Sequence, residues 1–174
     1  KVMIVCDTGM VEFGYTKTVE NVLRQRTEQP QIKIFSEVEP NPSTNTVYKG
    51  LEMMVDFQPD TIIAFGGGSA MDAAKAMWMF FEHPETSFFG AKQKFLDIGK
   101  RTYKIGMPEN ATFICIPTTS GTGSEVTPFA VITDSETNVK YPLADFALTP
   151  DVAIIDPQFV MSVPKSVTAD TGMD

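Results

Sequence analysis

The sequence predicts an α/β fold in which a Rossmann-like parallel sheet carries helices on both faces. Apolar runs of strand length recur along the chain, at Val2–Cys6, Ile32–Phe35, Thr61–Phe65 and Phe113–Ile116. Stretches with helical spacing of apolar residues separate these runs, at about Tyr15–Arg26, Thr44–Asp56 and Ala70–Phe81. Strands that alternate with helices across short loops are typical of a parallel sheet that is buried on both faces.

The individual elements follow from where the apolar residues lie. Val2–Cys6 is apolar throughout, which suits a strand buried on both faces. Apolar side chains share one face of each of the next two helices: Val19, Val22 and Leu23 in the first, and Val47, Leu51, Met54 and Val55 in the second. A turn-rich segment at 39–43 precedes the second of these helices.

The second half of the chain adds a β-hairpin to this sheet. Phe129–Thr133 and Val139–Leu143 flank a turn at 134–138, Val152–Ile155 is a further apolar strand, and a helix is expected from Pro164 onward. The less regular stretch 82–110 carries much local charge and is interpreted as surface elaboration, with His83 as a surface residue. We expect one domain over residues 1–174, truncated before any further domain.

Composition excludes several classes of protein. The chain has 174 residues and a formal net charge of −8, which disfavours binding to nucleic acid or to anionic membranes. No apolar run approaches the roughly 20 residues needed to cross a bilayer. Cys6 and Cys115 lie in separate apolar runs and are interpreted as reduced core residues. A cytoplasmic location is therefore predicted.

Gly66-Gly67-Gly68-Ser69 follows a predicted strand directly and precedes a helix directly. Without Cβ atoms, backbone N–H groups can approach a phosphate closely, and a helix N-terminus favours negative charge. The alternative is a tight turn without a ligand. Met71 stands where the third glycine of the usual dinucleotide fingerprint belongs, and no lysine follows as in a P-loop.

A second polar loop, residues 118–124, follows the strand at Phe113–Ile116 and contains five hydroxyl side chains and two glycines. In a parallel sheet it lies at the same edge as the glycine turn, where ligands bind. Alone, it also fits a polar surface loop with Ser124 as a helix cap. Together the two loops predict a nucleotide site.

Two charged residues are weaker candidates. Asp7 ends the first strand, where a carboxylate can accept hydrogen bonds from ribose hydroxyls and repel a 2′-phosphate, or simply cap a helix. Lys140, on the predicted hairpin, is by itself more typical of a solvated surface.

Longer segments resemble the iron-containing, or group III, alcohol dehydrogenases, at 66–75, 117–127, 140–156 and 169–174. Segments 77–85 and 97–101 resemble, more narrowly, the alcohol dehydrogenase portion of bifunctional aldehyde–alcohol dehydrogenases. The resemblance implies a dehydroquinate-synthase-like N-terminal domain that binds NAD, followed in the family by an all-helical metal domain that is absent here.

The resemblance also implies roles for individual residues. Asp7 would contact the adenosine ribose, Asn41 would lie near the cofactor, and Lys140 would bond the nicotinamide ribose. The other implied cofactor residues are Gly67, Gly68, Ser69, Asp72, Thr118, Thr119, Thr122, Thr127 and Val131. Asp174 would be the first ligand of a divalent metal, Fe²⁺ or Zn²⁺, with histidine ligands beyond it.

The implied activity is hydride transfer between NADH and a small aldehyde such as acetaldehyde, in a homo-oligomer or filament, with this segment inactive alone. Two alternatives stay open. One is a relative of dehydroquinate synthase or glycerol-1-phosphate dehydrogenase, and the other is a nucleotide-binding or assembly module without chemistry of its own.

Overall fold

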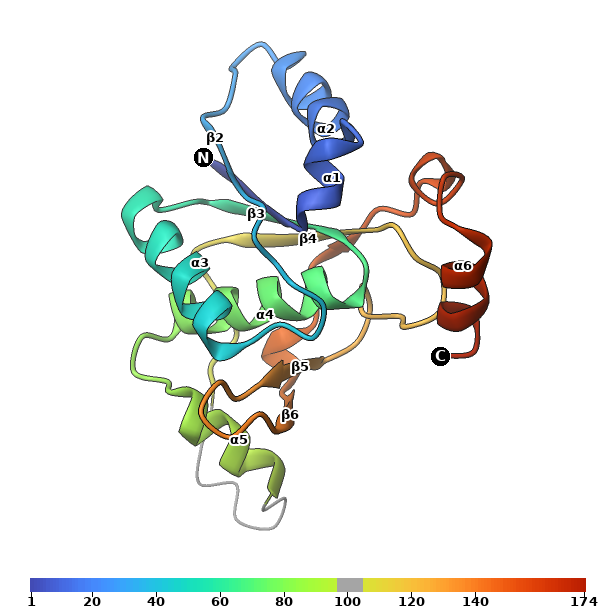
Figure 1. Ribbon diagram of the computed structural model, residues 1–174. Helices are drawn as coiled ribbons and strands as arrows, with labels where there is room; N and C mark the ends of the chain where they lie inside the picture. Colours follow the sequence, from blue (N-terminus) through green and yellow to red (C-terminus); the bar gives the residue numbers. More distant parts are fainter. Residues whose placement is uncertain (97–104) are drawn as a thin grey trace.

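A computed structural model of the protein describes residues 1–96 and 105–174. Its centre is a five-stranded sheet of order β2-β1-β3-β4-β7, in which every pairing is parallel. The strands are β1 (Val2–Cys6), β2 (Ile32–Phe35), β3 (Thr61–Gly66), β4 (Thr112–Pro117) and β7 (Val152–Ala153). An antiparallel hairpin of β5 (Phe129–Thr133) and β6 (Lys140–Ala144) packs apart from the sheet (Figure 1). The predicted fold class is confirmed.

Side chains alternate across the sheet and build two hydrophobic layers, as the two-residue repeat of a strand requires. Met3 and Val5 of β1 join the layer that contains α3 (Thr44–Phe57), α4 (Gly68–Glu82) and the hairpin. Ile4 and Cys6 point to the other layer, which contains α1 (Thr8–Glu12), α2 (Tyr15–Arg24) and the 3-10 turn η2 (Pro157–Phe159). Helices therefore cover both faces, as predicted.

Helix α4 lies between the sheet and the hairpin (Figure 1) and is buried along most of its length. The ring of Trp78 stacks on Phe113 of β4 at 4.6 Å, and its Nε1 donates a hydrogen bond to the Ala111 carbonyl at 3.2 Å. Buried alanines on the same helix allow its close approach to the strands. This helix is the central packing element of the larger layer.

The interpretation of 82–110 as surface elaboration is wrong for its described part. Helix α5 (Phe88–Leu96) begins there, and Phe88 and Ala91 are buried. Phe88 packs edge-on against Tyr141 of β6, with ring centroids 6.1 Å apart. The His83 side chain is only 15% exposed, so it is not the surface residue that we expected. The segment 97–101, used for the resemblance, lies outside the described residues.

The remaining differences are small. Helix α1 was not predicted, β6 begins one residue later than expected, and β7 is shorter than Val152–Ile155. Helix α6 (Lys165–Gly172) matches the helix expected after Pro164. Cys6 and Cys115 are free and buried, as predicted. Burial raises the pKa of each thiol to about 12, so both side chains are protonated packing groups.

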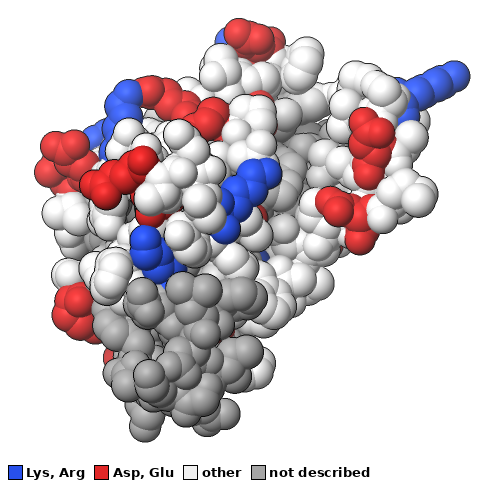
Figure 2. All heavy atoms as spheres, turned by 60° about the horizontal axis from the view of Figure 1, so that its bottom comes forward, with Lys and Arg blue, Asp and Glu red and all other residues white. Residues whose placement is uncertain are grey.

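The surface shows mixed charge. On the face in Figure 2, acidic and basic side chains are interspersed, and the basic ones form no continuous stripe there. Within the described residues, no helix is both long enough and apolar enough to span a membrane.

Candidate functional site

The glycine turn and the hydroxyl loop leave the sheet side by side. In the pairing of β3 with β4, Gly66 stands opposite Pro117, and the Thr118 N–H donates to the Gly66 carbonyl at 2.9 Å. Gly66 has φ 147°, and a Cβ there would lie 2.8 Å from the Ala70 Cβ. Only glycine fits this position, because the left-handed region and the close approach both exclude a side chain. The predicted proximity of the two loops is confirmed.

The backbone of Gly67 and Gly68, which have no side chains, faces two threonines of the hydroxyl loop. A Cβ on Gly67 would lie 3.4 Å from the Thr119 Cγ2, and a Cβ on Gly68 would lie 3.1 Å from the Thr122 Cγ2. Helix α4 begins here with Gly67 as its N-cap and without a side-chain cap. The first N–H groups of a helix have no partner within the helix, so this end is suited to bind an anion.

The hydroxyl loop also holds a polar atom without a partner, beside Gly67. The Thr119 Oγ1 is buried and has no hydrogen-bond partner in the described part of the chain. A buried hydroxyl without a partner costs free energy, unless a ligand or a water molecule completes it. Thr118 is buried beside it. The arrangement therefore fits a ligand with hydrogen-bonding oxygens, and phosphate is such a ligand.

Asp7 has one of the two roles that the sequence left open, that of a helix cap, and its contact with a ribose stays a prediction. Its Oδ1 accepts a hydrogen bond from the Met10 N–H at 3.3 Å and so caps α1. Its Oδ2 faces the glycine turn, because a Cβ on Gly66 would lie 3.2 Å from it. The carboxylate that caps α1 is therefore held at the end of β1, with its second oxygen directed toward the glycine turn.

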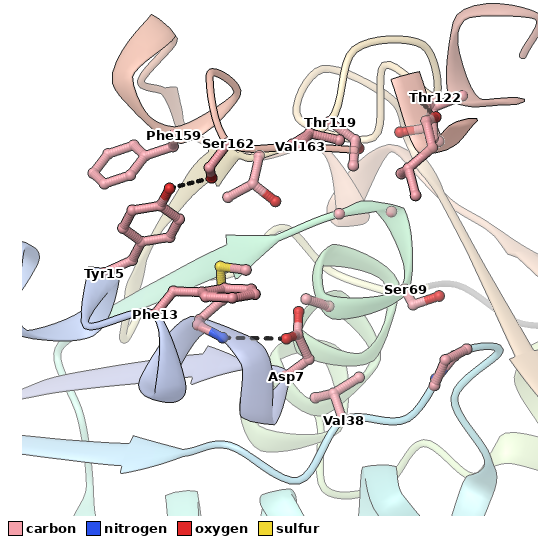
Figure 3. Close-up of a pocket in the computed structure, with 18 of the residues that line it drawn as sticks. Asp7, Phe13, Tyr15, Val38, Ser69, Thr119, Thr122, Phe159, Ser162 and Val163 are labelled. Atoms are coloured by element: carbon pink, nitrogen blue, oxygen red, sulfur yellow. Dashed lines mark hydrogen bonds between the residues drawn. The ribbon is translucent and has the colours of Figure 1, made fainter. Parts of the chain in front are cut away.

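These groups line a cavity of about 810 Å³, which lies within the usual size range of ligand sites. Asp7, the turn residues Gly67, Gly68 and Ser69, and Thr118, Thr119 and Thr122 all line it. Figure 3 shows an apolar wall on the other side, where Tyr15 lies edge-on to Phe159 with centroids 5.4 Å apart. The Tyr15 hydroxyl hydrogen-bonds Ser162 and closes this wall. The cavity therefore has a polar floor and an aromatic end.

Asn41 and Lys140 lie beside Ser69, outside the residues that line the cavity. Asn41 has a left-handed φ of 57°, and its N–H donates to the Ser69 Oγ at 3.2 Å. The Lys140 ammonium donates to the Asn41 Oδ1 at 2.7 Å. The structure thus joins three of the predicted site residues in one network at the margin of the cavity.

Thr127, Val131 and Asp72 surround a residue that the sequence did not single out. Lys75 is completely buried and donates to the Thr127 and Phe129 carbonyls at 2.6 and 2.9 Å, and to the Thr127 Oγ1 at 3.3 Å. The Asp72 Oδ2 accepts from the Val131 N–H at 3.0 Å. The positions 72 and 75 share one helix face, which was the available signal. Direct cofactor contact by Thr127, Val131 and Asp72 stays a prediction.

Burial shifts the pKa of both Asp72 and Lys75 in the direction that favours the neutral form. It raises the pKa of Asp72 to about 6, although the Val131 N–H, the charge of Lys75 and Ser124 all act to lower it. Burial also lowers the pKa of Lys75, while Asp72, Cys115 and Glu125 act to raise it. Lys75 is nevertheless fully hydrogen-bonded, because its three N–H donors meet three acceptor atoms.

The described residues do not form a metal centre by themselves. Within 1–96 and 105–174, no group of three or more His, Cys, Asp or Glu side chains converges. Asp174 is exposed just beyond α6, and its N–H donates to the Thr171 carbonyl. One carboxylate cannot hold a divalent ion as a structural or catalytic site does.

The residues that build this sheet, its glycine turn and its hydroxyl loop also match a known family by sequence. The family model described as iron-containing alcohol dehydrogenase matches residues 1–157. The chain belongs to the iron-containing alcohol dehydrogenase family. The resemblance inferred from the sequence is confirmed.

Individual relatives extend this result. Aldehyde-alcohol dehydrogenase 2 of Entamoeba histolytica is 60% identical over 175 residues, which cover 100% of this chain and 20% of that protein. The NADPH-dependent butanol dehydrogenase of Clostridium saccharobutylicum is 48% identical over 178 residues, which cover 100% of this chain and 43% of that protein. The chain therefore spans less than half the length of either relative.

A solved structure also shares the fold. The crystal structure of sulfoacetaldehyde reductase from Bifidobacterium kashiwanohense in complex with NAD⁺ superimposes with a TM-score of 0.81 at 29% identity. The match covers 100% of this chain and 43% of that one. The α/β architecture described above is thus that of the N-terminal region of family members.

Proposed function

We propose that this chain is the NAD(H)-binding portion of a metal-dependent alcohol dehydrogenase that interconverts a small aldehyde and its primary alcohol. The observation that carries the proposal is that the N-terminus of α4, which has no side-chain cap, and Thr119, whose Oγ1 has no hydrogen-bond partner in the described residues, line the same cavity. A diphosphate supplies acceptor oxygens for the unpaired N–H groups of the helix end.

The cavity orients the dinucleotide. Gly67, Gly68 and the N-terminus of α4 bind the diphosphate, and the free oxygen of Asp7 accepts hydrogen bonds from the adenosine ribose. The aromatic wall around Tyr15 then faces the adenine end. The nicotinamide end lies toward the Asn41–Lys140 network, where the Lys140 ammonium is available to the second ribose.

When bound, the nicotinamide ring would supply or accept the hydride of the carbonyl carbon, and a proton exchanged with solvent would complete the alcohol. In the complete protein, a second, helical domain provides the other wall of the site and the metal ligands that this chain lacks, and Asp174 contributes one ligand. The part of the chain described here binds and orients the cofactor. Acetaldehyde is the proposed substrate, Fe²⁺ the proposed metal with Zn²⁺ as the alternative, and a homo-oligomer or filament the proposed assembly.

The proposal favours NAD over NADP. The Asp7 carboxylate stands where a 2′-phosphate would bring two like charges together. The butanol dehydrogenase relative is named for NADPH, so the two cofactors must be compared directly. The family match favours an alcohol dehydrogenase over the dehydroquinate synthase and glycerol-1-phosphate dehydrogenase alternatives.

The variant Gly67→Ala tests the proposal. Its methyl group fits the free protein, because the nearest atoms are 3.4 and 3.5 Å away, but it adds bulk to the bare backbone that the diphosphate must approach. We expect the melting temperature to stay within about 2 °C and the KM for NADH in acetaldehyde reduction to rise at least about tenfold. Gly172→Ala is the matched control, because a Cβ there meets nothing within 4 Å. An unchanged KM for Gly67→Ala would exclude the assigned diphosphate position.

A further inference from the structure

The backbone edge of β5 is held by side chains from α4. Strand β5 pairs with β6 along one edge, and in the described residues its other edge meets a chain segment only at Thr133, in an isolated parallel bridge with Ser43, so the remaining N–H and C=O groups of that edge need partners. The Thr127 and Phe129 carbonyls accept from Lys75, and the Val131 N–H donates to Asp72. The Thr133 N–H donates to the Pro42 carbonyl at 2.8 Å. Side chains of α4 therefore supply, along most of this edge, the hydrogen bonds that a neighbouring strand supplies elsewhere.

Lys75 is directed away from the cofactor cavity. Its side chain has no exposed surface, and it is not among the residues that line the cavity. In other nucleotide-binding folds a lysine that follows a glycine-rich turn binds phosphate. Here its three donors are occupied by two carbonyls and one hydroxyl, so a phosphate has no access to it.

The same helix begins at the glycine turn, and this links the two halves of the site. Gly68 opens α4, and Lys75 follows two turns later, about 10 Å along a rigid axis. Lys75 donates to the β5 edge of the hairpin, and Lys140 begins the other strand of the same hairpin. The Lys140 ammonium donates to Asn41, and the Asn41 N–H donates to Ser69 at the start of α4. The contacts therefore close a ring that runs from the glycine turn through α4 and the hairpin and back.

We infer that Lys75 is a positioning residue, which sets the distance between the diphosphate turn and the nicotinamide end of the site by holding the edge of β5. This inference rests on the proposed NAD(H) site and assigns Lys75 no contact with the cofactor. Asp72 holds the next N–H of the same edge and acts with it.

The test compares two ligands that share the diphosphate. In the full-length protein carrying Lys75→Met, we measure the KM for NADH in acetaldehyde reduction and the inhibition constant of ADP-ribose, which lacks the nicotinamide. We expect the KM for NADH to rise about tenfold, because a displacement of about 1 Å has effects of this order or larger. The ADP-ribose constant should change less than about twofold, because Asp7 and the glycine turn stay in place.

Lys49→Met is the matched control. Lys49 pairs with Glu37 on the surface, with 60% of its side chain exposed, and no hydrogen bond or ion pair of the described residues joins it to the hairpin. We expect both ligand constants of this variant to match those of the unmodified protein.

Each other outcome has a definite meaning. Equal weakening of NADH and ADP-ribose by Lys75→Met would overturn the inference, and so would no change in either. If Lys75→Met does not fold, Lys75→Gln, which keeps an amide donor in place of the ammonium, must show the same selective loss of NADH for the inference to stand. If the unmodified protein shows no NADH-dependent reduction that ADP-ribose inhibits, the proposed function itself fails, and this inference with it.

Discussion

Glu82 lies at the C-terminal end of α4, where the helix dipole disfavours a negative charge. Its carboxylate is nevertheless held by the N–H groups of Glu109, Asn110 and Ala111 and by the Asn110 side-chain amide, at 2.8 to 3.2 Å. These bonds tie the segment that leads into β4 to the end of the helix. We expect Glu82→Gln to destabilise the protein strongly.

The magnitude follows from the geometry. In Glu82→Gln, an NH₂ group replaces one carboxylate oxygen and meets at least one backbone N–H that had donated to that oxygen. If the NH₂ group replaces Oε1, the buried N–H of Ala111 loses its acceptor. The other hydrogen bonds lose the negative charge of their acceptor. A hydrogen bond to a charged group contributes about 1.5–3 kcal/mol, so the expected loss in the free energy of unfolding is about 2–4 kcal/mol. Urea denaturation at pH 7 measures this loss, with the exposed Glu52→Gln as control.

The pH dependence gives an independent check. Burial alone would raise the pKa of Glu82, but the hydrogen bonds from the three N–H groups and from Asn110 outweigh it and lower the pKa below 4.5. A lowered pKa in the folded state gives stability that is fully present above 4.5 and is lost as the pH falls through the folded-state value. The difference between the two proteins should therefore shrink below pH 4.5. A loss under about 1 kcal/mol at pH 7 would refute the reasoning.

Three further predictions concern other parts of the molecule. Cys6 and Cys115 should resist Ellman's reagent in the folded protein and react fully in urea, because burial raises the pKa of both thiols to about 12. Rapid labelling of the protein without urea would contradict the burial of these thiols. Gly121→Ala should lower the free energy of unfolding by about 1–3 kcal/mol in urea denaturation, because φ is 152° and the new Cβ would lie 1.5 Å from the Thr171 carbonyl oxygen. An unchanged urea midpoint would show that α6 does not pack against Gly121 as described. Asp7→Ser should improve the ratio of kcat/KM for NADPH over NADH by about tenfold, because it removes a like charge from the 2′-phosphate. An unchanged ratio would show that the ribose lies elsewhere.

The sequence predicted those parts of the fold that depend on local pattern. Apolar runs revealed the strands, and the position of two polar loops after two such runs placed them at one edge of the sheet. Helix α5 was missed, because Phe88, Phe89 and Gly90 show no helical periodicity at its start. It is stabilised instead by distant contacts, such as the 3.0 Å ion pair of Lys92 with Asp134. Such contacts cannot be read from spacing along the chain.

The candidate site divides in the same way. The position of Gly67 and Gly68 beside the hydroxyl loop could be predicted from the sequence, because each loop directly follows an apolar strand, and their contact with a cofactor stays a prediction. Asp7 was ambiguous, since a ribose ligand and a helix cap use the same carboxylate, and the structure shows the cap. The contacts of Lys75 depend on how the hairpin folds back over α4, so the shared helix face of positions 72 and 75 was the only signal that the sequence offered for them.

The hydrogen bonds of Asp72 and Lys75 with the edge of β5 depend on the number of residues between these positions and the start of α4. Deletion of a single residue between Ser69 and Asp72 would rotate every later side chain by about 100°, since an α-helix has 3.6 residues per turn. The carboxylate and the ammonium would then leave the strand edge, while the rest of the helix would turn its large side chains toward new neighbours. Homologous enzymes should therefore tolerate changes of loop length on either side of this helix far better than any insertion or deletion within its first two turns.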